Sequence, residues 1–209
     1  MDAEKKHNLI SLIPNGLTFG RLALTVIFLS MVLYAPRLGP EEISDYLLIA
    51  FIIFVVAGLT DIIDGKVARA FNVASKFGRI VDPLADKILV CGAFVCFAIV
   101  GEPRLDNFNI APAALVIIRW AVAVILIGRE IFVTVLRQLA EARGISFAAT
   151  ASGKLKMFLQ SFAIGTVVIK WAYVTRVWGD WFAIVTFLLM VASTVISGVR
   201  SLNRPRGLS

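Results

Sequence analysis

The chain has 209 residues, of which 59% are hydrophobic and only 17% are charged, and its formal net charge is +7. Soluble domains are about 45–50% apolar and about 25% charged, so a water-soluble domain, a disordered chain and a disulfide-rich secreted scaffold are excluded. In a membrane protein, excess positive charge marks cytoplasmic loops and suits anionic lipid head groups or phosphorylated substrates. We therefore expect a lipid bilayer around the chain and no nucleic acid partner.

The apolar segments predict six transmembrane helices, because a spanning helix needs roughly 20 apolar residues. In chain order the expected helices cover residues 17–34, 46–70, 79–100, 112–142, 154–175 and 181–199. A polar juxtamembrane N-terminus, residues 1–16, precedes them, and a basic tail, residues 200–209, follows them. The expected fold class is an all-α polytopic membrane protein with a single domain, residues 1–209.

The distribution of lysine and arginine predicts the orientation. With six spans both termini lie on one side, and that side holds most of the basic residues: Lys5, Lys6, the links 66–79 and 137–156, and the tail. Cytoplasmic loops carry the excess of Lys and Arg. We therefore expect both termini in the cytoplasm and an inner-membrane location.

Four carboxylates interrupt the second and third apolar segments, where each costs roughly 2.5–3.5 kcal/mol at bilayer depth. Asp61 and Asp64 are three residues apart, and Asp82 and Asp86 are four apart, so each pair shares one helix face. A short link joins the two segments, so the pairs are expected to face each other near the cytoplasmic boundary. The alternative is a set of buried ion pairs with neighbouring Lys and Arg residues.

Four converging carboxylates repel one another unless cations bind between them. Oxygen ligands without nearby His or Cys favour Mg²⁺ or Mn²⁺ over zinc. Two such metals are a recurrent device of phosphoryl transfer, and the neighbouring residues suit a phosphate. Gly65 lets a ligand approach the backbone, Ala68 is small, Arg69 is a cation, and Gly78 allows close approach of helices.

The segment Asp61–Asp86 reads Asp-x-x-Asp-Gly-x-x-Ala-Arg, then eight residues, then Gly-x-x-x-Asp-x-x-x-Asp. At every fixed position this pattern resembles the signature of the CDP-alcohol phosphotransferase family. Further segments resemble the bacterial phosphatidylglycerophosphate synthases, a branch of that family: Ile13–Thr18 with Arg21, Asp82–Lys87, Gly128–Ile131 with Leu136 and Arg137, and Ser152–Lys156.

This resemblance implies a reaction, in which an alcohol hydroxyl attacks the lipid phosphorus of CDP-diacylglycerol and CMP leaves. It implies that Asp61, Asp64, Asp82 and Asp86 bind two divalent cations and that Asp86 is also the general base. It further implies a homodimer with the active site on the cytoplasmic side. The residues implied to hold CDP-diacylglycerol are Asn15, Thr18, Arg21, Gly65, Ala68, Arg69, Ser75 and Gly78.

Several cations near one membrane edge indicate a phosphorylated acceptor alcohol. Arg129 interrupts an apolar helix, Arg137 follows it in the same helix, and Lys154 and Lys156 begin the next one. A neutral alcohol would not need them, so we expect these four residues to bind the phosphate of sn-glycerol 3-phosphate. For a single lysine such as Lys156, ordinary positive charge of a cytoplasmic loop explains the residue equally well.

Two kinds of alternative remain. Inositol phosphate, serine or phosphatidylglycerol could be the acceptor in the same chemistry. Outside this class, the carboxylates could line the path of a divalent-cation transporter, although a path would spread charges across the membrane rather than gather them at one edge.

Overall fold

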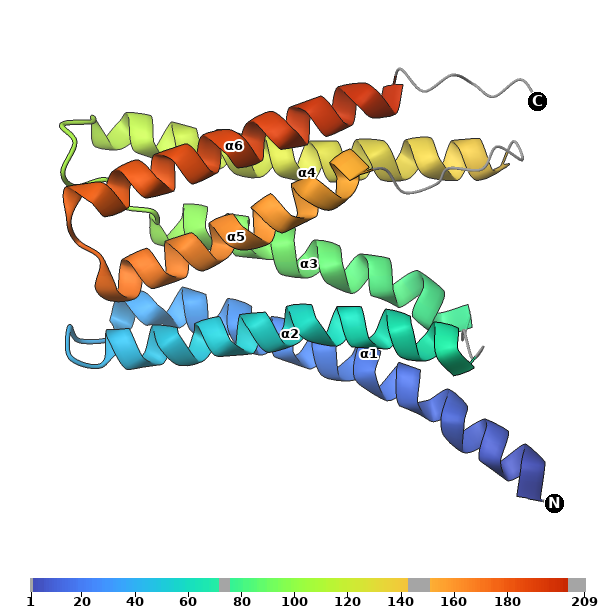
Figure 1. Cartoon of the computed structure of the whole chain (residues 1–209). Coiled ribbons are helices and arrows are strands. Elements are labelled where there is room, and N and C mark those ends of the chain that lie inside the picture. The colour runs from blue at the N-terminus through green and yellow to red at the C-terminus, as the bar shows by residue number, and fades with distance from the viewer. Residues whose placement is uncertain (1, 72–75, 143–150, 203–209) are drawn as a thin grey trace. The chain divides into compact units, whose positions relative to one another are not determined.

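The computed structural model describes the backbone of residues 2–71, 76–142 and 151–202, and side chains at 16, 18–60, 84–140, 142 and 153–201. Within these residues the regular elements are all helical (Figure 1). They are α1 (Asp2–Tyr34), the 3₁₀ turn η1 (Ala35–Arg37), α2 (Ile43–Phe71), α3 (Lys76–Val100), α4 (Pro112–Ala142), α5 (Ala151–Tyr173) and α6 (Val177–Leu202). The all-α fold class is thus confirmed for the described chain.

The first helix differs from its predicted bounds. It begins at Asp2, not at Leu17, and runs through Pro14. The early residues include Ala, Glu and Lys, which favour helix even without an apolar face. Proline removes one backbone hydrogen bond but does not always end a helix. The other five helices begin and end within a few residues of their predicted limits.

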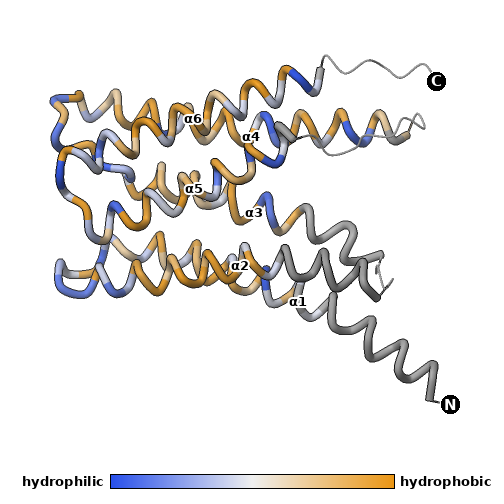
Figure 2. The backbone as a smooth tube through the Cα atoms, viewed as in Figure 1, coloured by the Kyte–Doolittle hydropathy of each residue, from blue (hydrophilic) through white to orange (hydrophobic). Residues whose placement is uncertain are grey.

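Among the residues whose side chains are described, four helical segments are long and apolar enough to cross a membrane: Thr18–Arg37, Ile43–Thr60, Gly153–Tyr173 and Val177–Ser201. Figure 2 shows the apolar residues that dominate α2 and α6. The apolar run of α3 contains Asp86 and Lys87, and that of α4 contains Arg119, Arg129 and Glu130. A membrane protein is therefore supported, and charges lie within the apolar runs of α3 and α4 as well as at Arg21 of α1 and Lys156 of α5.

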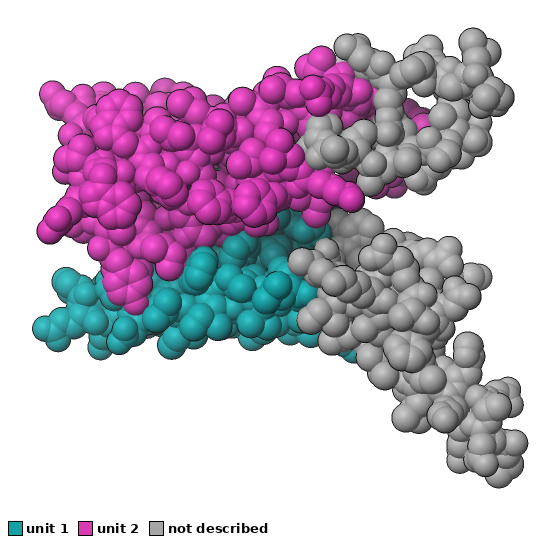
Figure 3. Space-filling view, viewed as in Figure 1, with its two compact units in different colours: residues 1–96 teal, residues 97–209 magenta. Residues whose placement is uncertain are grey.

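The chain forms two compact units, residues 1–96 and 97–209 (Figure 3). In unit 1, α1 and α2 are antiparallel neighbours. Phe28 of α1 is fully buried, and its ring lies 5.3 Å from that of Phe54 on α2. Gly92 of α3 faces α1, because a Cβ atom there would lie 2.7 Å from Cδ1 of Leu29. Close packing of small and aromatic residues therefore joins the three helices.

In unit 2, α6 packs against both α4 and α5. The chain turns within three residues between α5 and α6, so these two helices run antiparallel (Figure 1). As a result the end of α4, the start of α5 and the end of α6 lie at one end of the unit. The loop 101–111 and the α5–α6 turn lie at the other end.

Asp180, in the first turn of α6, joins the elements at this second end. Its carboxylate is 1% exposed and pairs through Oδ1 with Nζ of Lys170 on α5, at 2.8 Å. Nδ2 of Asn107 in the loop donates to its Oδ2 at 2.7 Å. Lys170 also donates to the carbonyl of Arg104 at 2.6 Å. These contacts fix the loop 101–111 against α5 and α6.

Glu102 anchors the beginning of the same loop. The backbone N–H of Arg104 donates to its Oε2 at 2.9 Å, and the Arg104 guanidinium lies 3.2 Å from its Oε1. Burial raises the pKa of this carboxyl above its ordinary value, against the lowering effect of the Arg104 N–H and of nearby positive charges. Arg119 of α4 donates to the carbonyl of Pro103 at 2.9 Å, so the loop is tied to α4 as well.

Asp180→Ala tests the importance of this network. Removing one partner of a buried ion pair typically costs about 3–5 kcal/mol, because the Lys170 ammonium, 10% exposed, is left without its counter-charge. We expect the melting temperature of the detergent-purified protein to fall by about 6–20 °C. Asp106→Asn, which changes an exposed carboxylate of the same loop, is the control and should shift it by no more than about 2 °C. Equal shifts in the two variants would contradict the assigned role.

Candidate active site

The predicted metal ligands lie on two consecutive helices. Asp61 and Asp64 belong to α2, and Asp82 and Asp86 belong to α3. The helical geometry on which the predicted pairing depends is therefore present, since positions three and four apart return to the same face. Of these four side chains the structure describes only that of Asp86, which is half-buried. Among the side chains it describes, no three His, Cys, Asp or Glu residues are grouped as a metal site.

The donor-binding residues predicted from the sequence are partly described. Thr18 and Arg21 of α1 are both 1% exposed. The ring contacts Tyr34–Tyr46 and Phe28–Phe54 give the register of α1 against α2. Continued along both helices, this register brings Thr18 and Arg21 level with the last turns of α2. The remaining predicted residues, Asn15, Gly65, Ala68, Arg69, Ser75 and Gly78, lie outside the described side chains.

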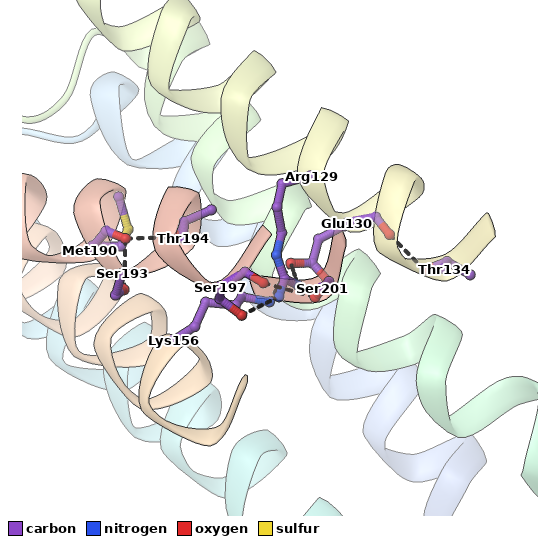
Figure 4. Close-up of polar contacts among 9 residues, drawn as sticks. All are labelled: Arg129, Glu130, Thr134, Lys156, Met190, Ser193, Thr194, Ser197 and Ser201. Atoms are coloured by element: carbon purple, nitrogen blue, oxygen red, sulfur yellow. Dashed lines mark hydrogen bonds and ion pairs between the residues drawn. The ribbon is translucent and has the colours of Figure 1, made fainter. Parts of the chain in front are cut away.

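Two of the predicted acceptor-binding cations meet in unit 2. Oε1 of Glu130 on α4 accepts from Nη1 of Arg129, at 3.0 Å, and from Nζ of Lys156 on α5. The Arg129 side chain is 12% exposed and the Lys156 side chain 6%. Figure 4 shows the three side chains converging from α4 and α5, with Ser197 of α6 beside them.

This cluster carries more positive than negative charge. One carboxylate serves two cations, and a charge removed from water needs a full set of partners. Nε of Arg129 is buried and has no hydrogen-bond partner in the part of the chain that the structure describes. One turn along α5 from Lys156, Nε2 of the buried Gln160 is also without a partner among those residues. The cluster can therefore accept a further anionic group.

The other two predicted cations lie nearby in the fold but on the surface. Arg137, two turns after Arg129 on α4, and Lys154, in the first turn of α5, are both exposed. Both belong to the end of unit 2 where α4 ends and α5 begins. The structure therefore gives one buried cation, Lys156, one largely buried cation, Arg129, and two exposed ones at this end.

Ser197 was not predicted from the sequence. It is 2% exposed, and its Oγ accepts from Nη2 of Arg129 at 2.6 Å. A signal for it exists, since Ser193, Ser197 and Ser201 recur every four residues along an otherwise apolar helix and so share one face.

Comparisons with known proteins agree with the resemblance drawn from the motifs. The profile of the CDP-alcohol phosphatidyltransferase family matches residues 11–197. A Bacillus subtilis protein named CDP-diacylglycerol–glycerol-3-phosphate 3-phosphatidyltransferase is 36% identical over 163 residues, covering 75% of this chain and 76% of that protein. A Salmonella choleraesuis protein of the same name is 31% identical over 197 residues, covering 93% and 95%.

A Mycobacterium tuberculosis (H37Rv) protein named probable phosphatidylglycerophosphate synthase is 34% identical over 190 residues, covering 91% of this chain and 79% of that protein. The chain belongs to the CDP-alcohol phosphatidyltransferase family. The family predicted from the spacing between Asp61 and Asp86 is thereby confirmed.

Glu130→Ala tests the electrostatics of the cation cluster. The substitution leaves two buried cations without their shared carboxylate, and we expect the free energy of unfolding to fall by about 3–5 kcal/mol. Denaturant titration in detergent measures the change. Gln138→Ala, at an exposed position of the same helix, is the control and should change this free energy by less than about 0.5 kcal/mol. A Glu130→Ala variant as stable as the control would contradict a stabilising ion cluster.

Proposed function

We propose that the chain transfers the phosphatidyl group of CDP-diacylglycerol to sn-glycerol 3-phosphate, giving phosphatidylglycerophosphate and CMP. The observation that carries this proposal is the buried pair of cations, Arg129 and Lys156, joined at Glu130 in a member of this family. The Bacillus subtilis relative is named for this donor and this acceptor, which supports the same choice.

The reaction is a single displacement at phosphorus. The acceptor hydroxyl oxygen forms a bond to the phosphorus that carries diacylglycerol, and the bond from that phosphorus to the bridging oxygen breaks. CMP leaves with the electron pair of this bond. The hydroxyl proton passes to the carboxylate of Asp86, a half-buried group on α3.

The four aspartates suit two Mg²⁺ or Mn²⁺ ions, since the donor set consists of carboxylate oxygens. Asp61 and Asp64 of α2 and Asp82 and Asp86 of α3 would hold the ions. Bound there, a divalent cation neutralises phosphate charge that builds up as the leaving group departs. With such cations in place, the aspartates would hold the diphosphate of the donor beside Asp86, and most of the rate would come from this alignment.

The donor is held by residues of the first two helices and the link that follows them. Thr18 and Arg21 support this role, because a buried guanidinium and a hydroxyl suit a diphosphate. We propose the same role for Asn15, Gly65, Ala68, Arg69, Ser75 and Gly78.

The acceptor phosphate binds to Arg129 and Lys156, with Arg137 and Lys154 at the approach to this cluster. Cations in a largely buried site attract a phosphate more strongly than they would in water. Serine, a zwitterion, and phosphatidylglycerol, with a single diester charge, would compensate this charge less than a terminal phosphate does. Inositol phosphate would compensate the positive charge of the cluster as well. The experiment must therefore distinguish inositol phosphate from glycerol 3-phosphate as the acceptor.

We propose six transmembrane spans with both termini in the cytoplasm and the active site at the cytoplasmic side of the inner membrane. The four apolar segments support spanning by α1, α2, α5 and α6. The family profile extends from residue 11 to residue 197, which supports a single functional domain. We also propose that two copies of the chain form a homodimer.

CMP release by purified protein in detergent tests the reaction. With CDP-diacylglycerol and Mg²⁺, release should depend on glycerol 3-phosphate and not on inositol phosphate or serine. Asp86→Asn should lower the rate by about 100-fold or more, because general-base catalysis contributes at least that factor. Asp106→Asn, at an exposed loop carboxylate, is the control and should keep the parent rate. Release with serine alone, or an active Asp86→Asn variant, would overturn the assignment.

Metal depletion tests the carboxylate site. Treatment with EDTA followed by gel filtration should abolish CMP release, and Mg²⁺ or Mn²⁺ should restore it. Asp64→Asn removes one oxygen ligand charge and should raise the Mg²⁺ concentration needed for half-maximal rate by about tenfold or more. Undiminished activity in protein shown by elemental analysis to lack divalent metal would contradict the proposed site.

A further inference from the structure

The guanidinium of Arg129 is held on two sides. Nη1 donates to Oε1 of Glu130 on the same helix, at 3.0 Å, and Nη2 donates to Oγ of Ser197 on α6, at 2.6 Å. An arginine side chain is long and flexible, but two hydrogen bonds from different helices restrict its planar head group to one orientation. Figure 4 shows this arrangement.

The stem of Arg129 also lies against α6. A Cβ atom at Gly198 would lie 3.5 Å from Cγ of Arg129, an ordinary van der Waals distance, so the stem lies beside α6 at this residue. Ser197 and Gly198 are consecutive, so the head group and the stem of the arginine both lie against the same turn of α6.

The hydroxyl of Ser197 has a different kind of hydrogen-bond partner from the other hydroxyl groups nearby on α6. Ser193 and Thr194 donate to the carbonyl of Met190, and Ser201 donates to the carbonyl of Ser197. These bonds stay within the helix, as is usual for Ser and Thr in apolar helices. Ser197 instead receives a hydrogen bond from another helix, and the partner is a cation of the proposed acceptor site.

Holding Arg129 in this way leaves donors for a ligand. A guanidinium has five N–H groups, and the described contacts engage one on each Nη atom. Nε is buried and has no partner in the part of the chain that the structure describes. An arginine already fixed in place loses less side-chain freedom when an anion binds, which improves affinity.

We propose that Ser197 is a positioning residue for the acceptor: its hydroxyl orients Arg129 so that the guanidinium binds the phosphate of the attacking alcohol. The inference rests on the proposed function, because it assumes that Arg129 binds that phosphate. It assigns to α6 a part in acceptor affinity, with no effect on donor binding or on the chemical step.

Steady-state kinetics of CMP release test this role. Ser197→Ala should raise KM for glycerol 3-phosphate by about three- to tenfold, while KM for CDP-diacylglycerol and kcat stay within about twofold of the parent. Ser197→Cys keeps the shape but offers only a weak acceptor, and should give the same rise in KM. Ser197→Thr keeps the hydroxyl and should restore a low KM.

Ser193→Ala is the matched control, because it removes a hydroxyl one turn away that contacts only Met190 among the described contacts. It should leave KM for glycerol 3-phosphate unchanged. A double-mutant cycle adds a second control: with Arg129→Lys as background, Ser197→Ala should raise KM by less than twofold further, since the hydroxyl then has no guanidinium to orient.

The outcomes separate the two levels of the proposal. If the parent protein releases no CMP with glycerol 3-phosphate, the proposed function fails. If the parent is active and Ser197→Ala leaves KM for glycerol 3-phosphate unchanged, or raises both KM values alike, only the role of Ser197 is overturned. An undiminished effect of Ser197→Ala in the Arg129→Lys background would likewise overturn it.

Discussion

The constraint on which unit 2 depends is that charges inside apolar helices need partners. Arg129 and Glu130 of α4 and Lys156 of α5 satisfy this constraint with a single carboxylate oxygen, which receives hydrogen bonds from both cations. The resulting cluster fixes α4 relative to α5, and the bond from Arg129 to Ser197 adds α6. The same contacts therefore hold the three helices together and fix the positions of the two cations.

The two units carry residues that suit different ligands. Unit 1 contains the carboxylates of α2 and α3 and the buried Arg21 of α1, which suit metal ions and a diphosphate. Unit 2 contains the cations that suit a second phosphate. Each set occupies a different group of helices, so the donor and the acceptor can be recognised by separate residues.

Much of this organisation could be predicted from the sequence. The spacing of Asp61, Asp64, Asp82 and Asp86 indicated the family, and apolar length predicted the helices, since both signals are local. The predicted first span, 17–34, agrees with the apolar segment Thr18–Arg37, but α1 itself begins at Asp2, because hydropathy reports membrane depth and not the point where a helix begins. The recurrence of Ser193, Ser197 and Ser201 marks one face of α6, but it does not single out Ser197. A hydroxyl in a helix ordinarily bonds its own backbone, so only the tertiary structure reveals the contact with Arg129.

The two ends of unit 2 differ in how their charges are balanced. At the Asp180 end, two buried carboxylates, those of Glu102 and Asp180, pair with the cations Arg104 and Lys170. At the opposite end, the single carboxylate of Glu130 is shared by Arg129 and Lys156. An excess of charge of one sign raises the local concentration of a solute of the other sign. A phosphorylated acceptor is therefore drawn to the Glu130 end of unit 2 rather than to the Asp180 end.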